Sequence, residues 1–167
     1  MITLDERLKA CAEYVSGKGT VCDVGTDHAY LPAYLILSEK CRNAVAGDIN
    51  DGPLEFAEQT LNKYKLSDKI KLVKSDGLKN ISPENVSDVI IAGMGGETIS
   101  DILAEAEWLR NGVNLILQPM TRAQGLRKWL YKNGYEIISE RAVSHDRFNY
   151  TVINASYCGY RFNIGSV

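Results

Sequence analysis

The sequence predicts an α/β fold in which a mostly parallel seven-stranded sheet is covered by helices and ends in an antiparallel C-terminal hairpin. Two patterns predict this fold. Strand-like apolar runs alternate with amphipathic helical segments up to residue 133, and such alternation produces parallel strands joined by right-handed crossovers. The last two strand-like runs are separated by only a short loop, so they should pair antiparallel.

The first elements are a helix, a strand and a second helix. A helix is predicted over residues 2–15, with Thr3 as its N-cap, because apolar residues recur there near helical spacing: Ile2, Leu8, Cys11 and Val15. The segment GKG at 17–19 ends this helix. A buried strand follows at 20–24 (TVCDV), and the second helix is predicted within 29–40.

The same alternation continues to the hairpin. Further strands are predicted at 43–49, 69–76, 87–94 and 113–119. The helices between and after them are predicted at 51–66, after 97 and at 121–133. The closing strands are predicted at 135–143 and 148–157. Five parallel strands with an antiparallel pair at the end describe the sheet of a Rossmann-like class I methyltransferase.

Length and composition describe one domain with an ordinary core. The chain has 167 residues, of which 45% are hydrophobic and 24% charged, and its formal net charge of −2 gives no overall attraction for nucleic acid. The sequence shows no signal peptide and no apolar run of membrane length, which predicts a cytoplasmic protein without a membrane partner. The oligomeric state stays open, a monomer included.

The four cysteines form no CxxC pair and no zinc-type spacing. We therefore expect reduced thiols, with Cys11 and Cys22 in the core, and no metal site.

The turn after the first strand reads D-V-G-T-D-H-A and has one glycine, Gly25, between Asp23 and Asp27. Ligands of open α/β sheets bind at the carboxyl ends of the strands, so this turn should face a ligand. A dinucleotide needs a G-x-G-x-x-G turn, and carboxylates about 4 Å from its pyrophosphate would repel it. S-adenosylmethionine has no phosphate and carries a cationic ammonium and sulfonium. The turn therefore favours S-adenosylmethionine as the cofactor, although D-x-G is also common turn chemistry.

Acidic residues also end the next two strands. Asp48, in GDIN, can accept hydrogen bonds from both ribose hydroxyls of a nucleoside. Asp76, in SDG, can accept from an adenine amine, and Gly77 lets the backbone come close. Each aspartate alone can also be understood as a helix cap or turn residue, but three acidic strand ends in succession favour a shared ligand.

The fourth strand runs into AGMGGET, where Gly93, Gly95 and Gly96 indicate unusual backbone angles or a flat surface against a ligand. The alternative is a tight strand-to-helix turn. This position lacks the N/D-P-P-Y/F motif of methyltransferases that modify an amino nitrogen of a base. The absence of the motif implies a different nitrogen or a different way of holding the base.

Together these segments resemble the bacterial tRNA adenine-22 N1-methyltransferases, the TrmK family. The matching motifs are DVGTDHAYLP at 23–32, AGDINDGP at 46–53, SDGL at 75–78, IAGMGG at 91–96, LILQP at 115–119 and LRKWLYKNGYEI at 126–137. The resemblance implies methyl transfer from S-adenosylmethionine to N1 of adenine 22 in tRNA. It implies cofactor contacts at Asp23, Gly25, Asp48, Ile49, Asp76, Gly77 and Gly93. It implies target-base contacts at Asp27, Gly95 and Gly96.

The resemblance extends to about residue 155, so we expect a methyltransferase domain at 1–155 and a tail at 156–167. Members of the family usually continue into a C-terminal helical, coiled-coil domain thought to help grip tRNA, and this sequence stops before it. Two explanations stay open: the chain is a fragment of a longer protein, or its affinity for tRNA is weak.

Asp27 is the predicted catalytic residue. The N1 lone pair of adenine can attack the sulfonium carbon directly and the product base is cationic, so the site needs a negative group more than a strong base. Asp27 could accept a hydrogen bond or a proton from the N6 amine; alternatively it only caps the helix that starts near Ala29. His28 and Tyr30 are candidate base contacts, although His28 could instead be a structural loop residue and Tyr30 a core residue.

Two polar segments near the C-terminal end carry further candidate residues. Ser144, His145 and Asp146 are consecutive, so they should form a polar hairpin loop rather than a catalytic triad. Residues 118–147 hold six basic side chains against three acidic ones. Arg122 and Arg127 in this segment are predicted to contact tRNA phosphates, unless the segment is simply a solvated helix face.

Two other functions compete with tRNA methylation. One is a catalytically inert module that binds S-adenosylmethionine or RNA, and the retained Asp27 and glycine turn argue against it. The other is an NAD-dependent oxidoreductase, which the acidic turn disfavours.

Overall fold

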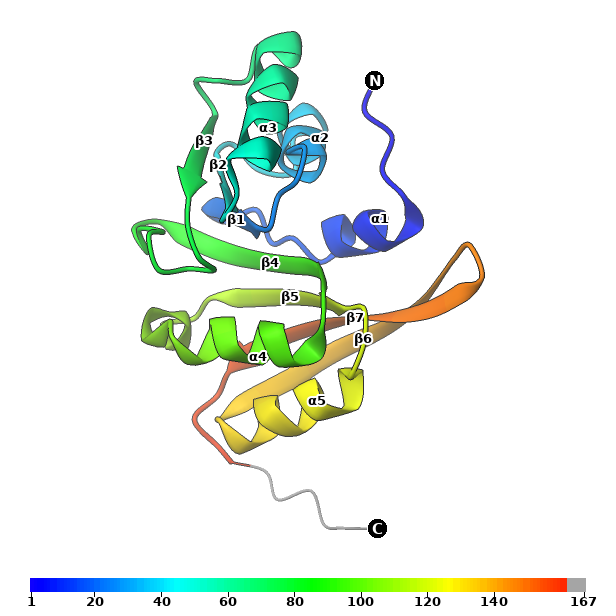
Figure 1. Cartoon of the computed structure of the whole chain (residues 1–167). Coiled ribbons are helices and arrows are strands. Elements are labelled where there is room, and N and C mark those ends of the chain that lie inside the picture. The colour runs from blue at the N-terminus through cyan, green and yellow to red at the C-terminus, as the bar shows by residue number, and fades with distance from the viewer. Residues whose placement is uncertain (162–167) are drawn as a thin grey trace.

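Strands and helices alternate along most of the chain, which the computed structural model describes over residues 1–161 (Figure 1). The strands are β1 (Thr20–Val24), β2 (Ala44–Asp48), β3 (Ile70–Lys74), β4 (Val86–Met94), β5 (Asn114–Pro119), β6 (Tyr135–His145) and β7 (Phe148–Tyr157). The helices are α1 (Glu6–Glu13), α2 (Tyr30–Leu37), α3 (Asp51–Tyr64), α4 (Gly96–Ala104) and α5 (Ala123–Lys132), with a short 3-10 helix, η1 (Glu107–Arg110). Every predicted element is present, with boundaries that differ by a few residues.

The strands form one seven-stranded sheet in the order β3-β2-β1-β4-β5-β7-β6. Neighbours among β1 to β5 are parallel, whereas β7 is antiparallel to both β5 and β6. The predicted fold class, including the C-terminal hairpin, is confirmed. The strand order reverses between β1 and β4, and the carboxyl ends of these two strands therefore open a crevice in which open α/β sheets bind ligands.

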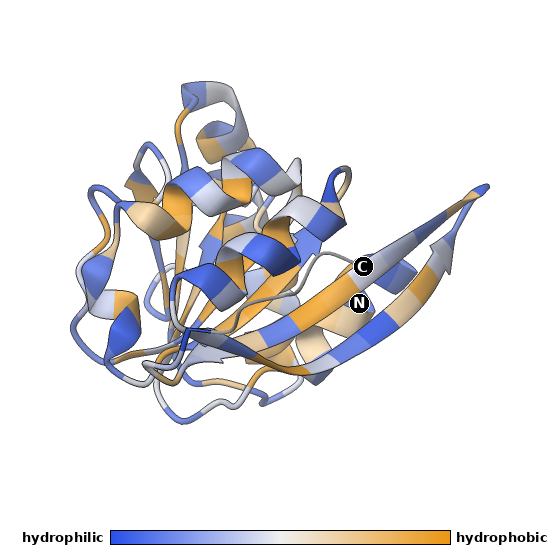
Figure 2. Cartoon of the chain, turned by 90° about the horizontal axis from the view of Figure 1, so that it is seen from below, coloured by the Kyte–Doolittle hydropathy of each residue, from blue (hydrophilic) through white to orange (hydrophobic). Residues whose placement is uncertain are grey.

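Helices cover both faces of the sheet, because the central strands send alternate side chains into two apolar cores. In β4, Ile90 joins the core with α1, α2 and α3, whereas Val89 and Ile91 join the core with α4 and α5. β5 repeats this alternation. Figure 2 shows largely hydrophobic strands in the middle of the molecule, with hydrophilic residues on the outer faces of the helices around them. The two cores hold the strand ends in fixed positions.

The first helix is shorter than predicted. Its N-cap is Asp5 rather than Thr3, because the Asp5 carboxylate accepts the backbone N–H of Leu8 at 3.0 Å. Burial alone would raise the pKa of Asp5, but the Leu8 N–H and the Arg7 guanidinium outweigh burial, so the pKa is lowered. Ile2 is buried in the first core without belonging to the helix.

A buried carboxylate ties three segments together near the amino ends of the strands. Asp88 of β4 is fully buried. Its Oδ1 accepts the Ser16 backbone N–H at 2.7 Å and the Asn114 side-chain amide at 2.8 Å. Its Oδ2 accepts the hydroxyls of Ser16 at 2.8 Å and Ser87 at 2.5 Å. These hydrogen bonds compensate the buried charge and fix the loop between α1 and β1 against β4 and β5.

The β6–β7 hairpin extends past the rest of the sheet (Figures 1 and 2). α1 packs against it, with the hydroxyls of Tyr14 and Ser139 hydrogen-bonded at 2.9 Å and Glu13 paired with Arg141. This contact places the first helix beside the last two strands.

The tip of the hairpin carries no triad. Ser144 and His145 are the last residues of β6 rather than part of the predicted loop. The Ser144 hydroxyl donates to Asn149 Oδ1 at 2.8 Å, across the hairpin, and His145 lies 3.4 Å from the exposed Asp146 carboxylate. The strand backbone therefore points Ser144 away from the histidine.

All four cysteines lie within residues 1–161 and are free thiols. Cys11 and Cys22 are fully buried as predicted, and burial raises the pKa of both thiols, which makes them unreactive core residues.

Among the described helices, none is long and apolar enough to cross a membrane. β7 ends at Tyr157, two residues beyond the expected domain boundary, and residues 162–167 of the expected tail lie outside the described residues.

Candidate active site

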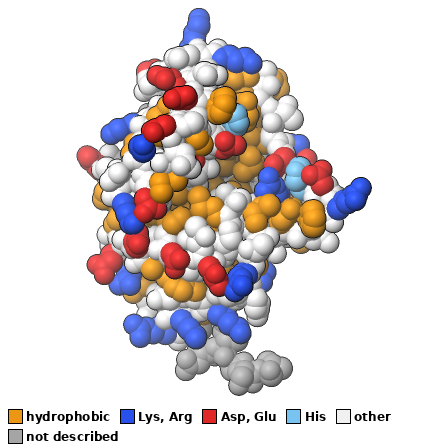
Figure 3. All heavy atoms as spheres, in the orientation of Figure 1, with side chains coloured by type: hydrophobic (Ala, Val, Ile, Leu, Met, Phe, Trp, Pro, Cys, Tyr) orange, Lys and Arg blue, Asp and Glu red, His pale blue; other side chains and the backbone are white. Residues whose placement is uncertain are grey.

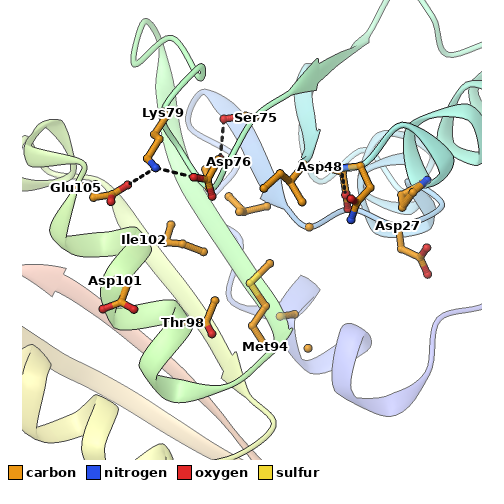
Figure 4. A pocket seen from close by; sticks show the side chains of 18 residues that line it. Asp27, Asp48, Ser75, Asp76, Lys79, Met94, Thr98, Asp101, Ile102 and Glu105 are labelled. Atoms are coloured by element: carbon orange, nitrogen blue, oxygen red, sulfur yellow. Dashed lines mark hydrogen bonds and ion pairs between the residues drawn. The ribbon is translucent and has the colours of Figure 1, made fainter.

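A pocket of about 590 Å³, called the larger pocket below, opens at the carboxyl ends of the parallel strands (Figure 4). Six of the predicted cofactor residues line it: Gly25, Asp48, Ile49, Asp76, Gly77 and Gly93. The parallel strands bring these residues together, because each lies at or just after a strand end. α4 closes the opposite side with Thr98, Asp101 and Ile102, which sequence reasoning missed.

Asp48 is nearly buried, with 9% of its surface exposed, and its Oδ1 accepts the backbone N–H of Asn50 at 2.9 Å. This hydrogen bond fixes the direction of the carboxylate at the end of β2. Asp48 is therefore both a turn residue and a carboxylate that lines the larger pocket.

Asp76 belongs to an ion-pair group at one end of the larger pocket. Lys79 Nζ lies 2.5 Å from Asp76 Oδ2 and 3.5 Å from Glu105 Oε2. Figure 4 shows this group at the end of the pocket opposite Asp27. Lys79 and Glu105 were not predicted from the sequence, since Glu105 follows α4 and only the fold brings it to β3.

A second pocket of about 310 Å³, called here the smaller pocket, adjoins the larger one. The two pockets share four lining residues: Gly25, Asp27, Ala92 and Gly93. Asp23, the remaining predicted cofactor residue, lines the smaller pocket and is 5% exposed. Burial raises the pKa of Asp23 to about 6, the Asp48 carboxylate acts in the same direction, and the Thr26 side chain opposes it.

The β1–α2 turn projects Asp27 between the two pockets. Gly25 has a φ of +74°, an angle that favours glycine, and a Cβ there would require the flexible end of the Met94 side chain, 2.4 Å away, to shift. The N–H groups of Gly25 and Thr26 both donate to the Gly47 carbonyl, at 2.8 and 3.0 Å, which anchors the turn to β2. The Asp27 side chain is left 73% exposed.

The capping explanation for Asp27 is wrong. The N-cap of α2 is Ala29, in the left-handed region with a φ of 56°, and no side chain caps this helix. The carboxylate of Asp27 instead lies 3.7 Å from His28 Nε2 at the pocket junction. Tyr30 is 45% exposed and lines the smaller pocket, so the core explanation for Tyr30 is also wrong.

Arg7 of α1 is a residue of the smaller pocket that sequence reasoning missed. Its guanidinium, with the side chain 18% exposed, donates to Gln118 Oε1 at 3.4 Å and to Asp5 Oδ2 at 2.9 Å. The same Gln118 oxygen accepts the backbone N–H of Gly93 at 3.2 Å. These hydrogen bonds connect α1 to a wall that the two pockets share.

The structure does not bring Gly95 and Gly96 into either pocket. A Cβ on Gly96 would lie 2.5 Å from the Arg122 carbonyl oxygen, and the Gly96 N–H donates to Thr121 at 2.8 Å. Close packing of α4 against the β5–α5 turn therefore explains why residue 96 is glycine. This agrees with the alternative explanation of the glycine run as a tight strand-to-helix turn. A contact of Gly95 or Gly96 with the target base stays a prediction.

Arg122 and Arg127 lie outside both pockets and pair with acidic side chains. Arg122 Nη1 is 2.7 Å from Glu97, and Arg127 Nε is 2.6 Å from Glu140. Their charge is thus partly compensated within the chain. Within residues 1–161, no three His, Cys, Asp or Glu side chains gather where a metal ion could bind.

Comparison with known proteins agrees with this geometry. The chain matches a family model described as a methyltransferase domain over residues 4–153. It is 37% identical to the tRNA (adenine(22)-N(1))-methyltransferase of Bacillus subtilis (strain 168), over 98% of this chain and 72% of the relative.

Two solved structures extend the comparison. The crystal structure of the B. subtilis m1A22 tRNA methyltransferase TrmK has a TM-score of 0.90 and 38% identity, covering 95% of this chain and 68% of that chain. The structure of M. capricolum TrmK in complex with S-adenosyl-homocysteine has a TM-score of 0.86 and 32% identity, covering 96% of this chain and 72% of that chain. Sequence and structure thus point to the same set of proteins.

Proposed function

Because this chain belongs to the bacterial tRNA (adenine-22-N1)-methyltransferase family, we propose that it transfers a methyl group from S-adenosylmethionine to N1 of adenine 22 in tRNA. The observation that carries the proposal is the pair of adjoining pockets with the acidic turn between them. Methyl transfer requires the donor and the acceptor base to meet, and a shared wall brings the contents of two pockets together.

The residues of the larger pocket fit S-adenosylmethionine. A volume of about 590 Å³ is in the range of small-molecule sites. Within the larger pocket we assign Asp48 to the ribose hydroxyls, and Asp76 and Gly77 to the adenine end. We assign Asp23, which lines the adjoining smaller pocket beside the shared Gly25, to the cationic ammonium group that reaches past the shared wall. A pyrophosphate would meet carboxylates at each of these positions, so the same residues disfavour a dinucleotide.

When bound, the donor supplies an electrophilic methyl group on a sulfonium. The N1 lone pair of adenine forms the new C–N bond as the C–S bond breaks, and positive charge moves from sulfur to the base. Asp27 lies where the pockets meet, so its carboxylate stabilises the charge that develops on the base. It also accepts a hydrogen bond from the N6 amine, which orients the base.

The smaller pocket receives the target adenine after it leaves its stack in tRNA. Tyr30 and His28 line this pocket, and we assign Tyr30 to stacking on the adenine ring. Arg122 and Arg127 remain predicted phosphate contacts, because a surface ion pair is weak enough to be exchanged for a phosphate. We place this reaction in the cytoplasm.

The test is methyl transfer to unmodified tRNA purified from a strain that lacks the enzyme. We expect the methyl group at N1 of adenine 22 and S-adenosylmethionine binding in calorimetry. Donor binding without transfer would indicate an inert module, and binding of NAD in place of the donor would indicate an oxidoreductase. Either result would overturn the proposal.

Donor affinity should fall as the pH is lowered through about 6, the value to which burial raises the pKa of Asp23. Only the ionised carboxylate attracts the ammonium group, so protonation weakens binding by up to about tenfold per pH unit. Titration calorimetry between about pH 5 and pH 7 measures the effect.

Asp23→Asn is the matched control for this pH dependence. It should bind the donor more weakly at neutral pH and lose the dependence over the same range. The raised pKa of Asp23 also lowers the stability of the ligand-free protein at neutral pH. The carboxyl group has a higher pKa in the folded than in the unfolded protein, so folding stability is greatest below the unfolded pKa and falls as the pH rises through the folded pKa. Asp23→Asn should therefore unfold at a higher temperature without donor. An unchanged pH dependence in Asp23→Asn would exclude Asp23 as the titrating group.

A further inference from the structure

Three aromatic rings form a column beside the smaller pocket. The rings of Tyr30, at the start of α2, and His28, in the preceding turn, are stacked with centroids 5.1 Å apart and planes 8° from parallel. The His28 ring also meets the ring of Phe56 in α3, with centroids 4.9 Å apart and a tilt of 39°. The column therefore joins two segments that lie apart in the sequence.

The column faces solvent rather than the interior. Tyr30 is 45% exposed and Phe56 is 49% exposed, and neither belongs to the two apolar cores of the described residues. A single exposed hydrophobic residue is ordinary on a protein surface. A stacked group that leaves its outer ring in water, next to a pocket assigned to a base, indicates a surface made for a flat ligand.

The order of the rings gives the column a direction. His28 and Tyr30 line the smaller pocket, whereas Phe56 lines neither of the two pockets. The inner end is thus at the target adenine, and Phe56 is the outer end. On the face shown in Figure 3, hydrophobic side chains continue across the middle of the molecule between charged regions.

Resting on the proposed function, we propose that Phe56 is a stacking site for the nucleobase next to the target adenine in tRNA. A base that leaves its helix no longer stacks on its neighbours, so a neighbouring base has an unoccupied face. Aromatic side chains bind such faces whatever the base, because every base has a π-face. The column then holds the target and its neighbour at its two ends.

Phe56→Leu tests the proposal, since it keeps apolar bulk and removes the ring. We expect tRNA to bind about tenfold more weakly and its KM to rise by a similar factor, with turnover at saturating tRNA and donor affinity nearly unchanged. Phe56→Trp should restore tRNA binding. Leu37→Ala, at the other end of α2 and also 49% exposed, is the matched control and should bind tRNA like the unchanged protein.

A double-mutant cycle identifies the partner base. Synthetic tRNAs that lack the base on one side or the other of adenine 22 should lose affinity at one of these two positions. At that position, Phe56→Leu should cause no further loss, because the stacking partner is already gone. The stacking site would be overturned if Phe56→Leu and the missing base each weakened tRNA binding by independent factors at both positions. Unchanged tRNA affinity in Phe56→Leu would also overturn it.

The two proposals can fail separately. If the unchanged protein transfers no methyl group to tRNA, the proposed function fails. If it transfers the group and Phe56→Leu binds tRNA with unchanged affinity, the stacking site alone fails. Circular dichroism melting of each variant checks that it is folded.

Discussion

Asp27→Asn should slow methyl transfer by about a hundredfold to ten-thousandfold while leaving the affinity for S-adenosylmethionine nearly unchanged. The carboxylate lies where the two pockets meet and is 73% exposed, and it caps no helix, so the substitution removes no structural contact of the helix start. The loss should fall on the chemical step, because the positive charge that we propose Asp27 stabilises is absent from the unmodified base and develops as the methyl group is transferred.

Asparagine is the sharper substitution at this position. Residue 27 has a φ of 53°, and asparagine tolerates this left-handed angle about as well as aspartate, whereas alanine adds backbone strain. Asparagine also keeps an oxygen that can accept from the N6 amine. A large loss in Asp27→Asn would therefore assign the effect to charge, whereas a loss confined to Asp27→Ala would assign it to the missing hydrogen bond together with the backbone strain.

Single-turnover rates at saturating tRNA and donor measure the chemical step, and calorimetry measures donor binding. Turnover within about threefold of the unchanged protein in both variants would remove Asp27 from the mechanism.

Asp88→Ala should lower the free energy of unfolding by about 3 to 5 kcal/mol, which is the expected cost of leaving buried donors without their acceptor. The fully buried carboxylate accepts from Ser16, Ser87 and Asn114. Since the loop before β1 depends on these bonds, urea unfolding at constant pH should show an earlier midpoint.

Asp68, exposed in the loop between α3 and β3, provides the matched control. Asp68→Ala should change stability by no more than about 0.5 kcal/mol. Asp88 lines neither of the two pockets, so the folded fraction of Asp88→Ala should still bind the donor. A loss below about 1 kcal/mol would mean that the four donor groups of these three residues find other partners.

The sequence predicted the sheet well because the signals are local. Apolar runs of β1, β4 and β5 and the helical periodicity between them are visible in a few residues each, and the order of alternation then implies a parallel sheet. The strand-end residues Asp48 and Asp76 were predictable for the same reason, since parallel strands present their carboxyl ends at one edge.

Residues brought in by distant segments could not be predicted. Arg7 lies 111 residues from Gln118 in the sequence. The spacing of residues in α1 does not distinguish Arg7, which lines a pocket, from Lys9, which is exposed. Phe56 occupies an outer face of α3 and is recognised only through its contact with His28. Gly96 was predicted to contact the target base, but its position is explained by close helix packing. In the sequence, a glycine needed for packing looks the same as one that faces a ligand.

The shared wall has a thermodynamic consequence. Gly93 borders both pockets, and its backbone N–H is held through Gln118 by Arg7. Two ligands that touch the same backbone can change each other's binding free energy. This coupling is reciprocal: the factor by which the donor changes the affinity for RNA equals the factor by which RNA changes the affinity for the donor. Methyl transfer changes both occupants, so the demethylated cofactor and the modified RNA also change each other's affinity by one common factor.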